Sequence, residues 1–371
     1  MGSMKVKASV LVKQGPGDVT EYCSLTLDPP KANEVLVKIV ATGLCRSDLH
    51  YARGVWKHPL PVVLGHEAAG IIAEVGPGVS KDRIGEKVIL SLAPGCGICR
   101  FCALGQAYNC DAVVEAGLSG LMFDGTCRLH RDGKDVHHLA LLAAWAEYSV
   151  VPSLSAVTVP DETDLNTACL LGCGVSSGLG SVINTAKVRP ADSVAVFGCG
   201  GVGLNVIQGA RLVSALPIIA IDVNPNKRDA AMRFGATHFV DASAEDPIAA
   251  VKRIVPGGVD FAFEVTGEVE NANTVYWTIR RGGTTVLVGQ PSEGALASFP
   301  PYEISQFDQK ILGSMLGSMR PFIDYPKILN LAAHGKVDLG GLVSETLGLD
   351  AVDHAMRKME EGKINRVVFI P

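Results

Sequence analysis

The sequence lacks a run of about eighteen apolar residues, the length that a membrane-spanning helix needs, although 47% of its residues are hydrophobic. It also has little charge and no basic excess, since 19% of the residues are charged and the net charge is −5. Binding to nucleic-acid phosphates requires a basic face. We therefore expect a protein that acts neither in a membrane nor on nucleic acid.

A signal-peptide pattern and internal repeats are missing as well. The chain nevertheless has ten cysteines. Without an export signal we expect these to be reduced thiols in the cytoplasm rather than disulfides. The length of 371 residues suffices for two domains, each with its own hydrophobic core.

Two styles of sequence meet between residues 150 and 190. Residues 35–40 and 85–90 are short, alternating, strand-like runs broken by glycine and proline, which is typical of an antiparallel, barrel-like domain. After Pro190, uninterrupted apolar strands alternate with helical segments, an order that predicts an α/β domain with a doubly wound parallel sheet. The candidate strands of this sheet are residues 193–197, 218–222, 259–264, 284–288 and 311–316.

Four cysteines are spaced Cys-x2-Cys-x2-Cys-x7-Cys within a glycine-rich stretch. Two intervening residues let a tight turn aim successive sulfurs at one centre, so the spacing predicts a structural zinc site. An iron–sulfur cluster is disfavoured, because ferredoxin runs place three residues before the last cysteine and proline after it, whereas Asp111 follows here. The acidic net charge disfavours a nucleic-acid-binding zinc ribbon. The predicted ligands are Cys96, Cys99, Cys102 and Cys110.

A Gly-x-Gly-x-x-Gly motif follows the candidate strand 193–197 and opens an apolar helix that reaches about Ser214. In this context Gly198 allows a tight turn, Gly200 lets the backbone approach a pyrophosphate, and Gly203 lets the helix pack closely on the strand. The free amides at the helix N-terminus would bind the phosphates. The motif residues predicted to bind the cofactor are Gly198, Gly200, Gly201, Val202 and Gly203.

Asp222 ends the next candidate strand. A carboxylate at this position can accept hydrogen bonds from the adenosine ribose hydroxyls and would repel a 2′-phosphate. We therefore expect NAD rather than NADP, although the nearby Lys227 and Arg228 leave NADP open.

A second group of possible metal ligands lies earlier in the chain. Residues 45–50 read Cys-Arg-Ser-Asp-Leu-His and residues 65–67 read Gly-His-Glu. A catalytic zinc ion needs such donors. The His-Glu-x-x-His pattern of zinc proteases fails, because Gly70 stands where the second histidine belongs. Peptide hydrolysis is therefore disfavoured.

The pattern Gly65-His66-Glu67-x2-Gly70-x5-Gly76-x2-Val79 resembles the signature of zinc-dependent alcohol dehydrogenases of the medium-chain dehydrogenase family, and nearly the whole chain is similar to them. The resemblance implies a Rossmann doubly wound sheet together with a GroES-like, mainly β catalytic domain. It places the catalytic domain at residues 1–174, the NAD-binding domain at 175–315, and a return to the catalytic domain at 316–371.

The resemblance also assigns the catalytic zinc. It maps the ligands onto Cys45, His66 and Cys173, which leaves one position open for substrate. Glu67 is placed behind the metal, and Asp48 is expected to orient His66. With the four clustered cysteines, this gives two zinc ions per chain.

The same resemblance implies reversible hydride transfer between NAD and an apolar primary alcohol or aldehyde, aliphatic or aromatic. Zinc would lower the cost of removing the hydroxyl proton, with Ser47 accepting that proton and His50 passing it to solvent. The remaining residues matched to family positions are Arg46 and Arg366 at the pyrophosphate, Ser177 and Val202 at the nicotinamide, Lys227 and Val288 elsewhere along the cofactor, and Trp56, Leu92, Leu139 and Met315 in the substrate cleft.

Other functions stay open on the sequence alone. Residues 120–128 resemble glutathione-dependent formaldehyde dehydrogenases, but those enzymes usually have threonine at the position of Ser47 and an anion-binding arginine where Val113 or Val114 falls. A zinc-free quinone reductase is disfavoured by the intact zinc ligands. A noncatalytic zinc- and nucleotide-binding protein would not need the relay residues.

A homodimer is the expected assembly. Residues 117–138 resemble the longer loop of dimeric family members, and the strand-like run 311–316 could extend the sheet across a two-fold axis.

Overall fold

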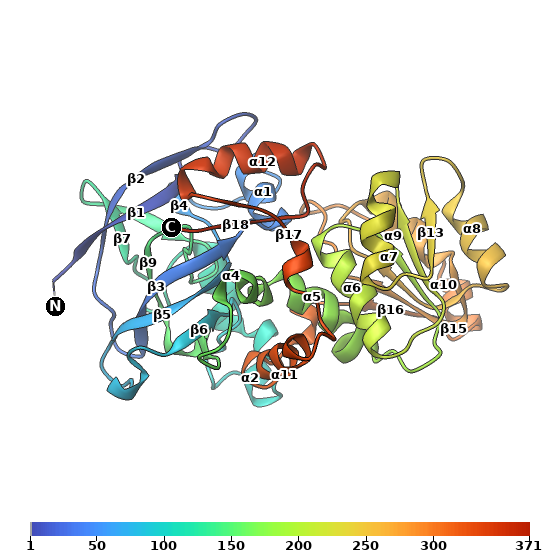
Figure 1. The fold of residues 1–371 in the computed structure, drawn as a ribbon, viewed down its shortest axis with the longest axis horizontal. Coiled ribbons are helices and arrows are strands. Elements are labelled where there is room, and N and C mark those ends of the chain that lie inside the picture. Colours follow the sequence, from blue (N-terminus) through green and yellow to red (C-terminus); the bar gives the residue numbers. More distant parts are fainter. Residues whose placement is uncertain (1) are drawn as a thin grey trace. The chain divides into compact units, whose positions relative to one another are not determined.

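The computed structural model describes residues 2–371, which divide into two compact units. The first unit runs to Cys173 and resumes with Arg320–Pro371, and the second is Gly174–Met319. The C-terminal segment, red in Figure 1, therefore belongs with the blue N-terminal segment. The domain boundaries expected from the sequence lie after residues 174 and 315, and those of the two units lie after residues 173 and 319.

The first unit contains a closed barrel of short strands. Its first two strands pair antiparallel from Met4↔Leu27 to Leu11↔Thr20. Val6, Ala8 and Val10, alternate residues of the first strand, are buried in an apolar core, as the two-residue period of a strand dictates, and Ser9 and Leu11 between and after them are buried as well. In order around the barrel the strands are β1 (Met4–Leu11), β2 (Thr20–Leu27), β7 (Leu129–Arg131), β8 (Lys134–His138) and β4 (Val62–Val63).

A seven-stranded sheet in the same unit takes up the C-terminal return, because its strand β18 pairs antiparallel with β3. Residues 35–40 form part of β3, as predicted. The strand predicted at residues 85–90 begins only at Lys87, because Gly85 has a φ of 92° and turns the chain. The strands are β10 (Ala156–Thr158), β6 (Lys87–Leu90), β5 (Glu67–Val75), β3 (Glu34–Gly43), β18 (Arg366–Phe369) and β17 (Val343–Leu347), with β9 (Tyr148–Pro152) also pairing with β3.

Short helices connect these strands, and α1 carries much of the predicted catalytic segment. The α-helices of the first unit are α1 (Arg46–Arg53), α2 (Arg100–Ala103), α3 (Asp111–Ser119), α4 (Leu165–Ala168), α11 (Pro321–Ala333) and α12 (Val352–Glu360). Among residues 2–371 no single helix is long and apolar enough to cross a membrane, and one bent pair of short helices passes that test by length and composition only.

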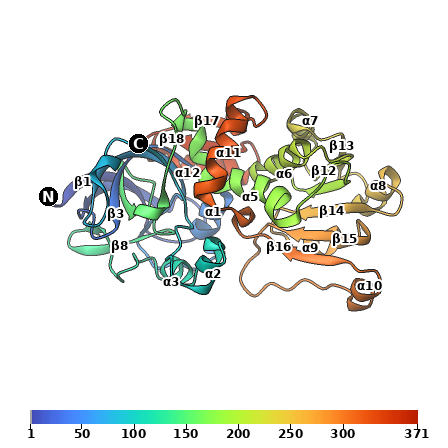
Figure 2. The ribbon, with the colours of Figure 1, turned by 90° about the horizontal axis from the view of Figure 1, so that it is seen from below.

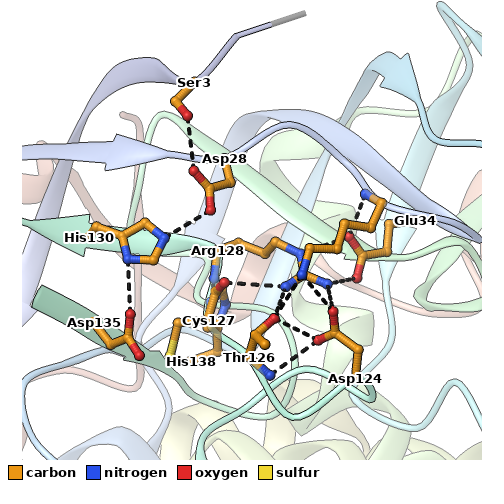
Figure 3. Close-up of polar contacts among 11 residues, drawn as sticks. Ser3, Asp28, Glu34, Asp124, Thr126, Cys127, Arg128, His130, Asp135 and His138 are labelled. Carbon is orange, nitrogen blue, oxygen red and sulfur yellow. Dashed lines mark hydrogen bonds and ion pairs between the residues drawn. The ribbon is translucent and has the colours of Figure 1, made fainter. Parts of the chain in front are cut away.

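A buried ion-pair network fastens the loop before β7 to the start of β3. Figure 3 shows Arg128 between Glu34 and Asp124, with guanidinium-to-carboxylate distances of 2.5 and 3.0 Å. Nearby, His130 lies between Asp28 and Asp135 at 2.9 and 3.0 Å. The contacts of Arg128 with Glu34 and of His130 with Asp28 join segments that are about one hundred residues apart in the chain.

The second unit is a six-stranded sheet in which every neighbouring pair is parallel. Its strand order reverses at the first strand, which is the arrangement of a doubly wound dinucleotide-binding sheet. In Figure 2 three of its strands lie side by side, namely β14, β15 and β16 (Val259–Glu264, Ile279–Leu287 and Lys310–Gly313). The strands are β13 (His238–Asp241), β12 (Ile218–Asp222), β11 (Val194–Phe197), β14 (Val259–Glu264), β15 (Ile279–Leu287) and β16 (Lys310–Gly313).

The helices of this unit are α5 (Gly174–Gly180), continued by a π-helical segment Ser181–Ala186, α6 (Gly201–Leu212), α7 (Arg228–Phe234), α8 (Pro247–Ile254), α9 (Val269–Tyr276) and α10 (Pro301–Gln306).

Two strand predictions for this sheet were wrong in detail. The strand expected at residues 311–316 ends at Gly313, because Leu316, Gly317 and Ser318 all have positive φ angles and form a left-handed turn. The edge strand β13 was not predicted at all. The strand expected at residues 284–288 is the second one that differs, because β15 already begins at Ile279 and ends at Leu287, which leaves Val288 one residue beyond it.

Candidate functional site

Three possible zinc ligands meet in the first unit. Cys45 immediately precedes α1, His66 lies between β4 and β5, and Cys173 follows a 3-10 turn at Cys169–Gly172. Their ligand atoms all lie within 4.8 Å of one another. Two thiols and an imidazole are donors that zinc prefers, and three protein ligands leave the fourth position of a tetrahedron open. The donor set therefore fits a catalytic zinc ion.

Of the two thiols, Cys45 is the one prepared for deprotonation, because a hydrogen bond with Cys45 and burial raise the pKa of Cys173 well above its ordinary value. A hydrogen bond with Cys173 lowers the pKa of Cys45 well below its ordinary value, and the positive charge of Arg366 adds to this against the opposing effect of burial. Because the thiolate is the form that binds metal, zinc binding would complete the release of the remaining proton.

Asp48 is fully buried and holds both halves of this site. Its Oδ2 accepts the N–H of Cys45 at 2.9 Å, and its Oδ1 accepts the N–H of Gly65 and the Nδ1–H of His66, both at 3.1 Å. Burial would lower the pKa of His66, but the charge of Asp48 and its hydrogen bond raise that pKa well above the ordinary value. Because Nδ1 is bound to Asp48, Nε2 is left for the metal.

Glu67 and Arg366 form a buried ion pair next to these ligands. The Nη2 of Arg366 is 3.4 Å from the Oε1 of Glu67, and its Nη1 donates to the carbonyl oxygen of Leu44 at 3.3 Å. Gly43 makes room for the pair, because a Cβ there would lie 2.5 Å from the Oε2 of Glu67. Arg366 is only 3% exposed, so its contact with a pyrophosphate stays a prediction.

The four clustered cysteines also converge, and their sulfurs lie within 4.8 Å of one another. The two short turns between them are each closed by a backbone N–H that donates to a sulfur. The N–H of Cys99 donates to the Sγ of Cys96 at 3.3 Å, and the N–H of Cys102 donates to the Sγ of Cys99 at 3.5 Å. The backbone hydrogen bond from Cys102 is the main reason why the pKa of Cys99 falls to about 6. Four thiols in this arrangement fit a closed, structural zinc site.

The predicted relay residues lie on α1, three positions apart and therefore on one side of the helix. The Oγ of Ser47 is 3.5 Å from the Sγ of Cys45. His50 is half-buried, and its ring lies against Trp56. Arg46, at the start of the same helix, is exposed.

The glycine motif lies in the second unit, between β11 and α6, as predicted. Gly198 has a φ of 102°, which glycine adopts without strain. A Cβ at Gly203 would lie 1.8 Å from the carbonyl oxygen of Gly198, so only glycine fits there. A Cβ at Gly200 would meet nothing within 4 Å, which leaves open space beside the backbone. This loop fits a pyrophosphate approaching the N-terminus of α6.

Asp222 ends β12 and braces the glycine loop. Its Oδ2 accepts the N–H of Cys199 at 2.7 Å, and its Oδ1 accepts the N–H of Asn224 at 2.9 Å. Lys227 is near enough for its pKa to respond to Asp222, although burial is the larger effect and lowers it. Elsewhere in this unit, Ser177 on α5 is half-buried.

Glu264 is a buried acid next to the strand that leads into the glycine motif, and the sequence did not single it out. It ends β14 and is 2% exposed. Its Oε1 accepts the N–H groups of Thr266 and Gly267 at 2.6 and 3.1 Å, while burial raises its pKa. It therefore shapes the turn after β14, beside the glycine motif on β11. A lone acid at the end of an apolar strand was the signal available in the sequence.

Comparison with known proteins agrees with this geometry. Residues 31–161 match the alcohol dehydrogenase GroES-like domain, and residues 201–334 match the zinc-binding dehydrogenase family. The S-(hydroxymethyl)glutathione dehydrogenases of Escherichia coli O139:H28 (strain E24377A / ETEC) and Shigella sonnei (strain Ss046) are 39% identical to the chain, over 98% of it and 100% of their own length.

Two solved structures are similar over the whole fold. An alcohol dehydrogenase zinc-binding domain protein from Burkholderia ambifaria has a TM-score of 0.94 and 31% identity, with 100% of both chains covered. Benzyl alcohol dehydrogenase from Acinetobacter calcoaceticus has a TM-score of 0.93 and 32% identity, with 99% of both chains covered. The chain therefore belongs to the zinc-dependent medium-chain dehydrogenase family and is an oxidoreductase whose cofactors are zinc and NAD.

Proposed function

We propose that the protein oxidises apolar primary alcohols, aliphatic or aromatic, with NAD, and catalyses the reverse reduction of the aldehydes. The observation that carries this proposal is the convergence of Cys45, His66 and Cys173, the first two of them buried, with the Ser47 hydroxyl 3.5 Å from the Cys45 sulfur. An alcohol must lose its hydroxyl proton before hydride can leave its carbon. The nearby hydroxyl of Ser47 can take part in that proton transfer.

The chain's own residues divide the work. When bound, zinc supplies Lewis acidity to the alcohol oxygen and NAD accepts the hydride. Ser47 accepts the hydroxyl proton as it passes its own hydroxyl proton on toward His50, and His50 releases a proton to solvent. Asp48 keeps His66 in the tautomer that binds metal, and the pair of Glu67 and Arg366 balances buried charge beside the thiolates.

The dinucleotide residues bind NAD in preference to NADP. The carboxylate of Asp222, at the end of β12, would accept hydrogen bonds from the ribose hydroxyls and would repel a 2′-phosphate. We place Val202 and Ser177 at the nicotinamide and Val288 elsewhere along the cofactor, by family likeness.

An apolar substrate is supported by the side chains assigned to the cleft. In the first unit Trp56 and Leu92 are half-buried and Leu139 is buried. Apolar side chains with few polar groups are typical of sites for small apolar ligands. The named activity of the Acinetobacter relative, benzyl alcohol oxidation, is of this class.

S-(hydroxymethyl)glutathione is the second candidate substrate, because the E. coli relatives are named for it. The loop that resembles theirs is present, with Arg128 and Asp124 in an ion pair. Against it, Val113 packs on an apolar cluster and Val114 is 52% exposed, so neither position offers a guanidinium to a glycine carboxylate.

The test is NADH formation at alkaline pH by zinc-loaded protein with ethanol, hexanol, benzyl alcohol, cinnamyl alcohol and S-(hydroxymethyl)glutathione. We expect turnover of the simple alcohols that is lost in Cys45→Ala. Turnover of the glutathione adduct alone would replace the proposed substrate with the second candidate. Bound NAD without turnover of any alcohol would contradict the proposal.

We further propose a homodimer in the cytoplasm. Strand β16 is an edge of its sheet, so a second copy could pair with it across a two-fold axis. All ten cysteines are free, which suits a reducing compartment. Sedimentation velocity of the wild-type protein tests the dimer, and a monomer at micromolar concentration would contradict it.

A further inference from the structure

The indole ring of Trp56 lies against the imidazole ring of His50. Their centroids are 4.8 Å apart and their planes are tilted by 36°. Tyr51 meets the indole edge-on, at 5.3 Å and 75°. Aromatic rings attract one another in such tilted and edge-to-face arrangements. The half-buried His50 therefore has one face covered by Trp56.

The segment that carries Trp56 is fixed from outside. Helix α1 ends at Gly54, whose φ of 74° lets the chain turn back over the last turn of the helix. The Nε2 of Gln14 then donates to the carbonyl oxygens of both Tyr51 and Trp56, at 2.8 and 3.0 Å. The N–H of Trp56 also donates to the carbonyl oxygen of His50 at 3.4 Å. These contacts hold the backbone of Trp56 without using the side chain of His50.

We propose that Trp56 is a positioning residue for the proton relay, and that its indole ring fixes the orientation of His50 while also lining the substrate cleft. This inference rests on the proposed function, in which His50 receives the proton after Ser47. A half-exposed imidazole in the last turn of a helix has several rotamers available. Proton transfer needs hydrogen-bond reach, so only some of those rotamers serve the relay. An alcohol bulky enough to displace Trp56 would therefore also disturb His50.

The contact is tested without turnover by NMR of protein labelled at histidine Cε1, with His50→Gln identifying the His50 signal. Trp56→Leu should remove the ring-current shift of His50, and Trp56→Phe should keep part of it. Trp277→Leu is the matched control, because Trp277 pairs with Tyr276 in the other unit. A His50 signal that is the same in wild type and Trp56→Leu would overturn the proposal.

The consequence for catalysis is tested by single-turnover NADH formation from benzyl alcohol with enzyme in excess. We expect Trp56→Leu to slow this step about tenfold, because a misplaced relay group loses much of its catalytic effect, and Trp56→Phe to restore most of the rate. In a His50→Gln background Trp56→Leu should cause no further loss. An equal loss in both backgrounds would make Trp56 a cleft wall only and would overturn the proposal. A wild-type protein inactive with every alcohol would instead refute the proposed function, while the NMR shift would still report the contact.

Discussion

Among single residues, Asp48 connects the most parts of the catalytic site, because it binds both Cys45 and Gly65 through the backbone and orients His66. We predict that Asp48→Asn weakens zinc binding at this site by about 10- to 100-fold, since an amide cannot supply the charge that holds the imidazole. Dialysed protein should then retain nearer one zinc than two per chain by elemental analysis.

The matched control for this change is Asp82→Asn, whose carboxylate is exposed in a surface turn. It should keep both metals. Retention of two zinc ions by Asp48→Asn after the same dialysis would show that Asp48 has no part in holding the ligands.

His50 gives a prediction about pH. His50→Ala should lower the rate of alcohol oxidation more below neutral pH than at alkaline pH, because solvent hydroxide can replace part of a proton relay. The measurement is kcat/KM against pH for wild type and variant, with the exposed His334→Ala as control. A parallel loss at all pH values would remove His50 from the relay.

Residue-level prediction from the sequence succeeded where a ligand had a local context. The four clustered cysteines are close in sequence, and their convergence follows from tight turns. Cys173 had no such context, because its partners Cys45 and His66 lie on other elements, and only family likeness identified it. Glu264 was missed because its role depends on the turn it braces, which spacing does not show.

At the scale of elements, the buried network around Arg128 should stabilise the junction of β3 and β7 (Figure 3). Arg128→Met keeps the length of the side chain but leaves Glu34 buried without its cation. Breaking a buried ion pair on one side costs about 3–5 kcal/mol. We predict a loss of that size in the free energy of unfolding, measured by urea denaturation.

Arg131→Met, three residues further along at the end of β7, is the matched control. Arg131 pairs with Glu21 at 2.6 Å, but both side chains are exposed, so solvent screens the pair. Its removal should change the unfolding midpoint little. Equal effects of Arg128→Met and Arg131→Met would contradict the stabilising role of the buried network.

The contact of Asp28, just after β2, with His130 on β7 should be sensitive to acid. Burial would raise the pKa of Asp28, but hydrogen bonds from His130 and Ser3 outweigh it and lower that pKa. A carboxyl with a lowered folded pKa stabilises the protein above its unfolded pKa and loses that contribution as the pH falls through the folded value. The unfolding midpoint should therefore fall on acidification below about pH 4, and less so in Asp28→Asn.

Strands were predicted best where an apolar run marked them in the sequence. The strands β12 and β14 begin and end where their apolar runs do. The short edge strand β13, His238–Asp241, is only partly buried and gave no such run. The run at residues 311–316 looked like one strand, yet the left-handed turn at Leu316–Ser318 ends it, because backbone angles rather than hydrophobicity decide there.

At the scale of the whole molecule, the two styles of sequence correspond to two units with separate tasks. All zinc ligands and relay residues belong to the first unit, and the glycine motif with Asp222 belongs to the second. The C-terminal return was expected only from family likeness, because β18 pairs with β3 across more than three hundred residues of chain. Contacts of such long separation leave no periodic signal in a sequence.

This separation predicts that dinucleotide binding survives loss of the catalytic zinc. Cys45→Ala removes one ligand of that site but touches neither the glycine loop nor the four-cysteine site. NADH affinity, measured by fluorescence titration, should therefore stay within about a factor of two of wild type, since changes at sites that share no residues act additively. Asp222→Ala, which should weaken NADH binding while keeping both zinc ions, is the converse variant. If Cys45→Ala lost NADH binding with its circular dichroism intact, the metal and dinucleotide sites would have to be energetically coupled, and the division of tasks between the units would be wrong.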